Sequence, residues 1–173
     1  TMAEGKDVHF IQGACEALGL MRSEEALPTL VKLLVHQDRW VRYKAAEAVK
    51  KMGGTAKPAI ESILKALVAT AEPLWPIRWE DPVQIAHGQL AAAVFSGPLR
   101  EELKKVNPEL RNQAIRAVST NPDGMARATL EHCFQNQLSE DDVIELAPAI
   151  LAAVESPSPA DTMFNNVIRT QIE

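Results

Sequence analysis

Apolar residues recur along the first third of the chain with the spacing of amphipathic helices. In "EALPTLVKLLVHQ" they fall at i, i+3, i+4 and i+7, which places them on one stripe of a helix. Two further stripes follow within a few dozen residues. The three predicted stripes are Leu27, Leu30, Val31 and Leu34; Val41, Ala45, Ala48 and Met52; and Ile60, Ile63, Leu64 and Leu67. Helix therefore follows helix, and no stretch of the chain alternates with the period of a strand.

Polar residues mark where the predicted helices begin. Asp38 can cap the helix that carries the second stripe, and Gly53 can end it. Three later openings place proline at the first helical position behind a capping residue, at Asp81, Asn107 and Asn121. Ser139 and Ser158 supply two more starts, whereas Pro148 falls inside an apolar run and should kink or split that helix. These boundaries predict an all-α chain of about eight or nine helices.

One sequence pattern returns along the chain. "VRYKAAEAV" from Val41 matches "LRNQAIRAV" from Leu110, and "CEALGLM" lies 31 residues before its counterpart "AEAVKKM". Helical units that recur with such a period are typical of α-solenoids, in which each unit buries its apolar face against its neighbours. The repeated alanines favour close approach of two helices, because a larger side chain would hold them apart.

The segment "EALPTLVKLLVHQDRWVRYKAAEAVKKMG" resembles the HEAT-repeat family, with a leucine-rich first helix, an aspartate turn, a Val-Arg pair and an alanine-rich second helix. The resemblance implies a right-handed α-α superhelix of helical hairpins. It also implies a ladder between neighbouring repeats, formed here by Asp38 and Arg42. Arg111 occupies the matching position of the second copy, where Asn107 replaces the aspartate and weakens the expectation of a ladder.

We expect residues 1–173 to form a single module of this kind. Clear repeats cover residues 11–70, an insertion rich in tryptophan and proline covers 71–82, and degenerate repeats cover 82–173. The chain starts and stops within helical patterns, so we expect a piece of a larger, bacterial protein. Neither a signal peptide nor a membrane-spanning run is visible, and the compartment stays open.

The insertion "AEPLWPIRWEDP" holds three prolines and two of the three tryptophans of the chain. Its indoles could fold back and cover the end of a helix pair. Alternatively, Trp75, Arg78 and Trp79 could form an exposed recognition loop, because loops that interrupt a repeat often lie on the binding face. Both interpretations remain open, and covering is the favoured one for at least one indole.

The sequence offers no group of residues with the spacing of a catalytic or metal site. Its histidines, at positions 9, 36, 87 and 132, show no paired metal-ligand spacing, and neither a nucleophile motif nor a phosphate-binding loop is present. Cys15 and Cys133 are interpreted as small buried thiols. We therefore expect no catalytic residue, no metal and no cofactor.

Charge is spread unevenly over the chain. Residues 22–67 carry nine Lys/Arg against five Asp/Glu, whereas residues 68–173 carry eight against 15. A basic cluster is conceivable, made of Arg42, Lys44, Lys50, Lys51 and Lys57. Certain DNA glycosylases of similar architecture bind duplexes in this way, but the acidic remainder would repel a phosphate backbone. Solvated helix faces are the favoured interpretation, and nucleic acid is not expected as a partner.

The resemblance implies a non-catalytic protein-interaction or scaffolding module whose partner is a protein or peptide. The alternative is an accessory module of a multidomain enzyme that binds carbohydrate or peptide through the tryptophan loop. A nucleic-acid-processing solenoid ranks third. No membrane association is expected.

Overall fold

The computed structural model describes residues 2–71, 81–95 and 98–119. Every regular element in these ranges is helical, as the sequence predicts. The α-helices are α1 (Met2–Met21), α2 (Leu27–Leu34), α3 (Arg39–Met52), α4 (Ile60–Ala69), α5 (Pro82–Phe95) and α6 (Pro108–Ser119). Three 3-10 segments join them: η1 (Glu24–Ala26), η2 (Gly53–Ala59) and η3 (Arg100–Lys105). The described part thus holds six of the eight or nine expected helices, and the total count and the superhelical hand stay predictions.

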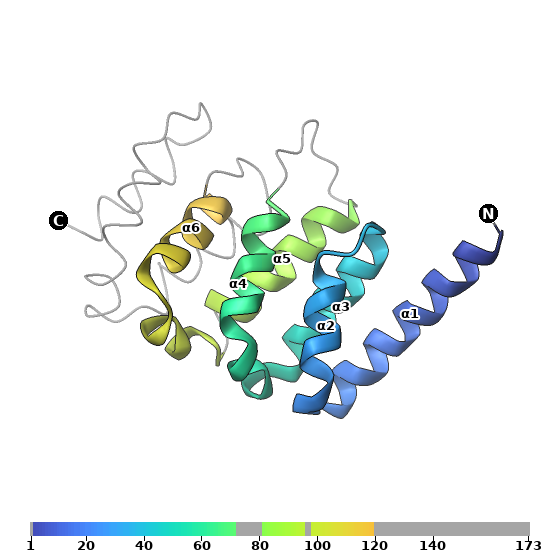
Figure 1. Cartoon of the computed structure of the whole chain (residues 1–173), viewed down its shortest axis with the longest axis horizontal. Coiled ribbons are helices and arrows are strands. Elements are labelled where there is room, and N and C mark those ends of the chain that lie inside the picture. The colour runs from blue at the N-terminus through green and yellow to red at the C-terminus, as the bar shows by residue number, and fades with distance from the viewer. Residues whose placement is uncertain (1, 72–80, 96–97, 120–173) are drawn as a thin grey trace.

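The helices form two layers, and successive helices alternate between them (Figure 1). In one layer α3 lies between α1 and α5 and packs extensively against both. In the other layer α2 packs on α3, α4 lies beside α2, and α6 packs against α4. This alternation of stacked helices is the arrangement that a repeat array uses to bury one continuous core.

Helix α3 begins and ends where the sequence predicts. The Asp38 carboxylate accepts hydrogen bonds from the backbone N–H groups of Trp40 at 2.9 Å and Val41 at 3.0 Å. These bonds satisfy two donors that the first helical turn leaves without an intrahelical partner. At the other end Gly53 adopts a φ of +56°, which residues with a side chain rarely adopt.

The two proline-led openings in the described part are also confirmed. Asp81 accepts from the backbone N–H of Val83 at 2.9 Å at the start of α5. Asn107 accepts from the backbone N–H of Glu109 at 2.8 Å at the start of α6. The remaining predicted starts, at Asn121, Ser139 and Ser158, and the kink at Pro148 lie outside the described residues.

The predicted stripes form much of the core, together with buried residues of α5, η3 and α6. All members of the stripes are buried except Val31, which is half-buried at the edge of α2. The alanines serve the close contact expected of them: a side-chain carbon added to Gly19 of α1 would lie only 2.7 Å from the Cα of Ala48 in α3. Because nothing larger than hydrogen fits there, α1 approaches α3 closely.

The repeated motif keeps only some of its buried positions in α6, since Leu110 and Ala117 are half-buried, and it does not keep its place in the fold. Ala114 and Val118 are buried like Ala45 and Val49, their counterparts in α3. However, α6 packs against α4, in the layer opposite to α3. The difference has a simple reason: an amphipathic pattern specifies which face of a helix is buried, not which helix covers it.

Candidate binding groove

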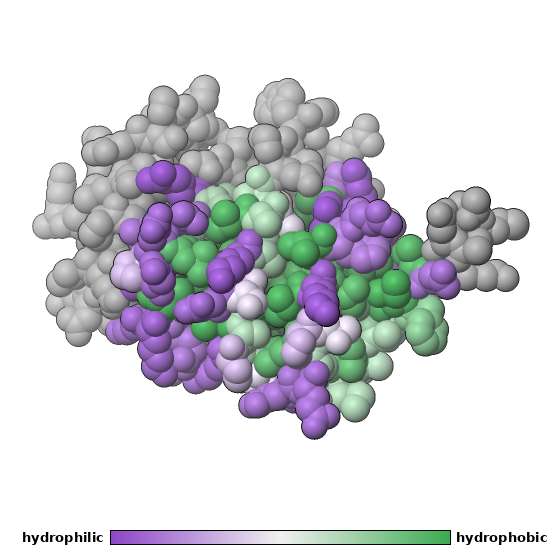
Figure 2. Space-filling view, in the orientation of Figure 1, coloured by the Kyte–Doolittle hydropathy of each residue, from purple (hydrophilic) through white to green (hydrophobic). Residues whose placement is uncertain are grey.

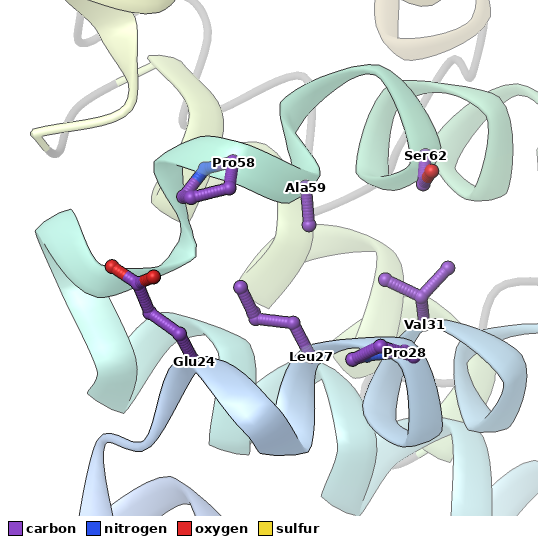
Figure 3. Close-up of a pocket in the computed structure, with 7 residues that line it drawn as sticks. All are labelled: Glu24, Leu27, Pro28, Val31, Pro58, Ala59 and Ser62. Carbon is purple, nitrogen blue, oxygen red and sulfur yellow. The ribbon is translucent and has the colours of Figure 1, made fainter.

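An open hollow of about 350 Å³ lies between α2 and the beginning of α4 (Figure 3). One wall comes from η1 and α2, the other from η2 and α4. Seven residues line it: Glu24, Leu27, Pro28, Val31, Pro58, Ala59 and Ser62. We call this hollow the α2–α4 groove.

Local sequence explains why the two helices leave a gap here. Leu27 turns into the core and is buried, while Pro28 is exposed and Val31 is half-buried on the groove side of α2. The facing wall offers only small or ring-shaped side chains, because Pro58, Ala59 and Ser62 stand opposite. Side chains of this size cannot fill the space between two helices, so a concave apolar strip remains.

The chemistry of the groove is that of a binding surface. Five of its seven lining residues are apolar, and its polar groups, the Glu24 carboxylate and the Ser62 hydroxyl, lie at opposite ends (Figure 3). Such a strip can accept an apolar side chain, while Glu24 can accept a hydrogen bond or pair with a cation. On the same face of the molecule, apolar surface extends across the middle and hydrophilic residues border it (Figure 2).

The sequence did not point to this groove. Its residues belong to two different predicted helices, and their convergence depends on how α2 and α4 pack. The only local signals were one proline in each wall, Pro28 and Pro58, and the small side chains at Ala59 and Ser62.

The predicted recognition residues Trp75, Arg78 and Trp79 lie outside the described residues, so the choice between a covering and an exposed loop stays a prediction. The structure does describe the end of this segment at Asp81. Its carboxylate lies 3.5 Å from the guanidinium Nη1 of Arg39, at the first turn of α3. The insertion therefore ends beside the turn between α2 and α3.

The first turn of α3 carries an exposed aromatic residue. Trp40 is 48% exposed, and its ring meets the ring of Tyr43 edge to face, with centroids 6.0 Å apart. Val35, at the end of α2, is also exposed. An aromatic surface thus lies close to the described end of the insertion, on a different part of the molecule from the α2–α4 groove lining.

The structure shows local hydrogen bonds for the residues of the predicted ladder. Asp38 caps α3, as described above, and accepts the backbone N–H of Arg42 through its own carbonyl at 3.2 Å. Arg111 is buried in α6, and its Nη1 donates to the carbonyl of Leu103 in η3 at 3.5 Å. Arg111 therefore ties α6 to the segment before it, while a ladder between repeats stays a prediction.

The positive charge of the basic cluster is largely offset by neighbouring carboxylates. Glu47 lies 3.0 Å from the Nζ of Lys44 and 3.2 Å from that of Lys51, and these lysines hold the pKa of Glu47 below its usual value. Lys57 contacts the carboxylates of Glu101 at 3.7 Å and Glu102 at 3.6 Å. Three lysines of the five-residue cluster are thus engaged with acidic groups, which disfavours a phosphate-binding surface.

Two groups with reactive side chains are enclosed in the core. His87 of α5 is 2% exposed, and its Nε2 lies 3.1 Å from the carbonyl of Leu67, to which it can donate. Burial lowers the pKa of His87, so the ring is neutral at neutral pH. Cys15 is buried as well, and burial raises the pKa of its thiol. Both side chains are inaccessible to a substrate.

In the part of the chain that the structure describes, no three His, Cys, Asp or Glu side chains gather as metal ligands do. None of the helices described is long and apolar enough to cross a membrane.

Comparison with known families agrees with the layered fold. Residues 3–78 match the family model of HEAT repeats, a range that covers α1 to α4 and with them both walls of the α2–α4 groove. No curated protein and no solved structure matches the chain. The repeated sequence pattern, the alternating two-layer packing and this match together show that residues 3–78 are built of HEAT repeats.

Proposed function

We propose that the chain is a non-catalytic protein-interaction module and that the α2–α4 groove is one of its recognition surfaces. HEAT repeats commonly bind other proteins. The observation that carries the proposal is the groove itself, an open, mainly apolar strip whose walls are Pro28 and Val31 on one side and Pro58 and Ala59 on the other. Its occupant is a peptide segment of a partner protein that inserts one or two apolar side chains. In this proposal the protein acts as a bacterial scaffold.

The polar ends of the groove orient the bound segment. Glu24 stands at one end, where it attracts a lysine, an arginine or a free backbone N–H of the peptide. Ser62, at the other end, can donate or accept a hydrogen bond. A matching peptide thus carries an apolar residue with a basic residue on one side.

Selection from a random peptide library on the immobilised 173-residue chain tests this proposal. We expect selected peptides to share an apolar residue flanked by a basic one, and to be lost when selection is repeated with Ser62→Arg, whose long side chain would fill the groove. Thr29→Arg is the matched control, because Thr29 is exposed on α2 away from the groove lining. Peptides without a shared pattern, or equally enriched on the Ser62→Arg variant, would count against the groove.

The alternative is an accessory module that binds a substrate for an enzyme. Its support in the described structure is the exposed ring of Trp40 near the end of the insertion, since flat aromatic surfaces bind sugars and peptides by stacking. Quenching of tryptophan fluorescence by soluble oligosaccharides would favour this alternative, and Trp40→Ala would then reduce the quenching.

A further inference from the structure

The α2–α4 groove continues beyond the residues that line its hollow. The first turns of α2 and α4 both border the hollow, and the two helices run in the same direction (Figure 1). Further along, the exposed Val35 lies four residues after Val31, and the exposed Ala69 lies seven residues after Ser62 on α4. Residues at these spacings share one face of a helix. Both walls therefore keep their character, apolar on α2 and small on α4, towards the C-terminal ends of the helices.

The two ends of this strip differ in charge. Glu24 and Glu25 are exposed at the end where both helices begin. Further along, the exposed Lys32 of α2 and Lys65 of α4 outnumber the one exposed carboxylate in this part of α4, Glu61. None of the ion pairs between described residues involves any of these five side chains, so their charges are available to a ligand. The strip is thus acidic at one end and basic towards the other.

We propose that the segment bound under the function proposed above is an amphipathic helix with an acidic first turn and a basic last turn, running antiparallel to α2 and α4. The seven residues from Ser62 to Ala69 rise about 10.5 Å along the helix axis. Positions i and i+7 of a bound helix have the same separation, so one apolar side chain can face each of these small residues. An extended peptide would cover this distance in about three residues, whose side chains alternate between two faces.

Charge determines the direction of the bound helix. Its basic end is attracted to Glu24 and its acidic end to Lys65. The macrodipole of a helix favours acidic residues in the first turn and basic residues in the last turn. Because Glu24 lies where α2 and α4 begin, both conditions are met together only when the bound helix runs opposite to them.

Two synthetic peptides of equal composition test the proposal. Both carry leucines at i, i+3, i+4 and i+7. The first has glutamates in its first turn and lysines in its last turn, and the second has these charges exchanged. At low ionic strength, fluorescence anisotropy should show that the first peptide binds the wild-type chain about fivefold more tightly than the second. Lys65→Glu should remove most of this preference. Lys50→Glu is the matched control and should leave the preference unchanged, because Lys50 is an exposed lysine on α3, in the other layer.

Two further changes test the length of the strip and the helical form of the ligand. Ala69→Arg should weaken binding of the first peptide by about tenfold, because its long side chain would cover the far end of the strip. Thr29→Arg, away from the groove lining, should leave binding unchanged. A proline in the middle of the first peptide should abolish binding, because it breaks the helix. Circular dichroism establishes that the protein variants keep the helical fold.

The outcomes separate this proposal from the function on which it rests. If the library-selected peptides are lost with Ser62→Arg, but Lys65→Glu and Ala69→Arg leave binding of the first synthetic peptide unchanged, the groove binds a peptide and the helix proposal is overturned. Undiminished binding of the proline peptide, or failure of both synthetic peptides to bind, would overturn it as well. If Ser62→Arg affects neither the selected nor the synthetic peptides, both proposals fall.

Discussion

At the scale of single residues, small side chains decide how the helices stack. Because Gly19 has no side chain, α1 can lie against the backbone of Ala48. A side-chain carbon at position 19 would lie 2.7 Å from the Cα of Ala48. The alanine pattern in the sequence predicted close helix contacts at Ala45 and Ala48, and both are buried. The residue that contacts Ala48 could not be predicted, because the partner of a small residue depends on the packing of a second helix.

A larger side chain at this contact should destabilise the fold. Ala48→Leu would add three carbon atoms beside Gly19 and should lower the free energy of unfolding by about 1–3 kcal/mol, the usual cost of overpacking a core. Urea denaturation measures the change. Lys50→Leu, an exposed position in the same helix, is the control and should leave the midpoint nearly unchanged. Equal tolerance of both substitutions would show that α1 does not sit on α3 as described.

Stability should also depend on the protonation of His87. Its ordinary pKa near 6.5 applies to the unfolded chain, and burial lowers the pKa in the folded state. The unfolded chain therefore binds the proton first, so the contribution of neutral His87 is fully present above about pH 6.5 and falls as the pH drops from there towards the folded-state pKa.

Urea titrations between neutral and mildly acidic pH measure this loss. His87→Gln can still donate to the carbonyl of Leu67 but cannot titrate, so its stability should fall less over the same interval. If wild type and variant lose stability in parallel, other groups are responsible for the acid sensitivity.

At the scale of elements, local signals in the sequence located the helix starts. Asp38, Asp81 and Asn107 all cap the helices predicted to begin beside them, since a cap needs only its own side chain and the next three residues. The layer that each helix joins was not predictable in the same way. Helix α6 shares the sequence motif of α3 yet packs in the other layer, because its neighbours come from distant parts of the chain.

Removing a cap should destabilise α3 without changing its packing. Asp38→Ala leaves the backbone N–H groups of Trp40 and Val41 without this acceptor and should cost about 0.5–2 kcal/mol of unfolding free energy. Asp38→Asn retains an acceptor oxygen and should lose much less. Thermal unfolding of the three chains compares them directly, and an alanine variant as stable as the asparagine variant would contradict the capping role.

At the scale of the whole molecule, two layers of stacked helices create surfaces that no single helix has. The α2–α4 groove arises from this stacking, between neighbouring helices of one layer. Sequence periodicity predicted the helices, and their resemblance to HEAT repeats predicted that they form a helical repeat. The groove escaped prediction because its shape depends on the spacing between Val31 and Ser62, which lie on separate helices.

The affinity of a library-selected peptide for matched variants tests the central claim most directly, namely that the α2–α4 groove binds a partner's apolar side chain. Fluorescence anisotropy of the labelled peptide should show binding to the wild-type chain and to Thr29→Arg with nearly equal dissociation constants. Ser62→Arg, with the groove filled, should bind about tenfold more weakly, which corresponds to about 1.4 kcal/mol. Equal affinity for all three chains would place the binding surface elsewhere and contradict the account.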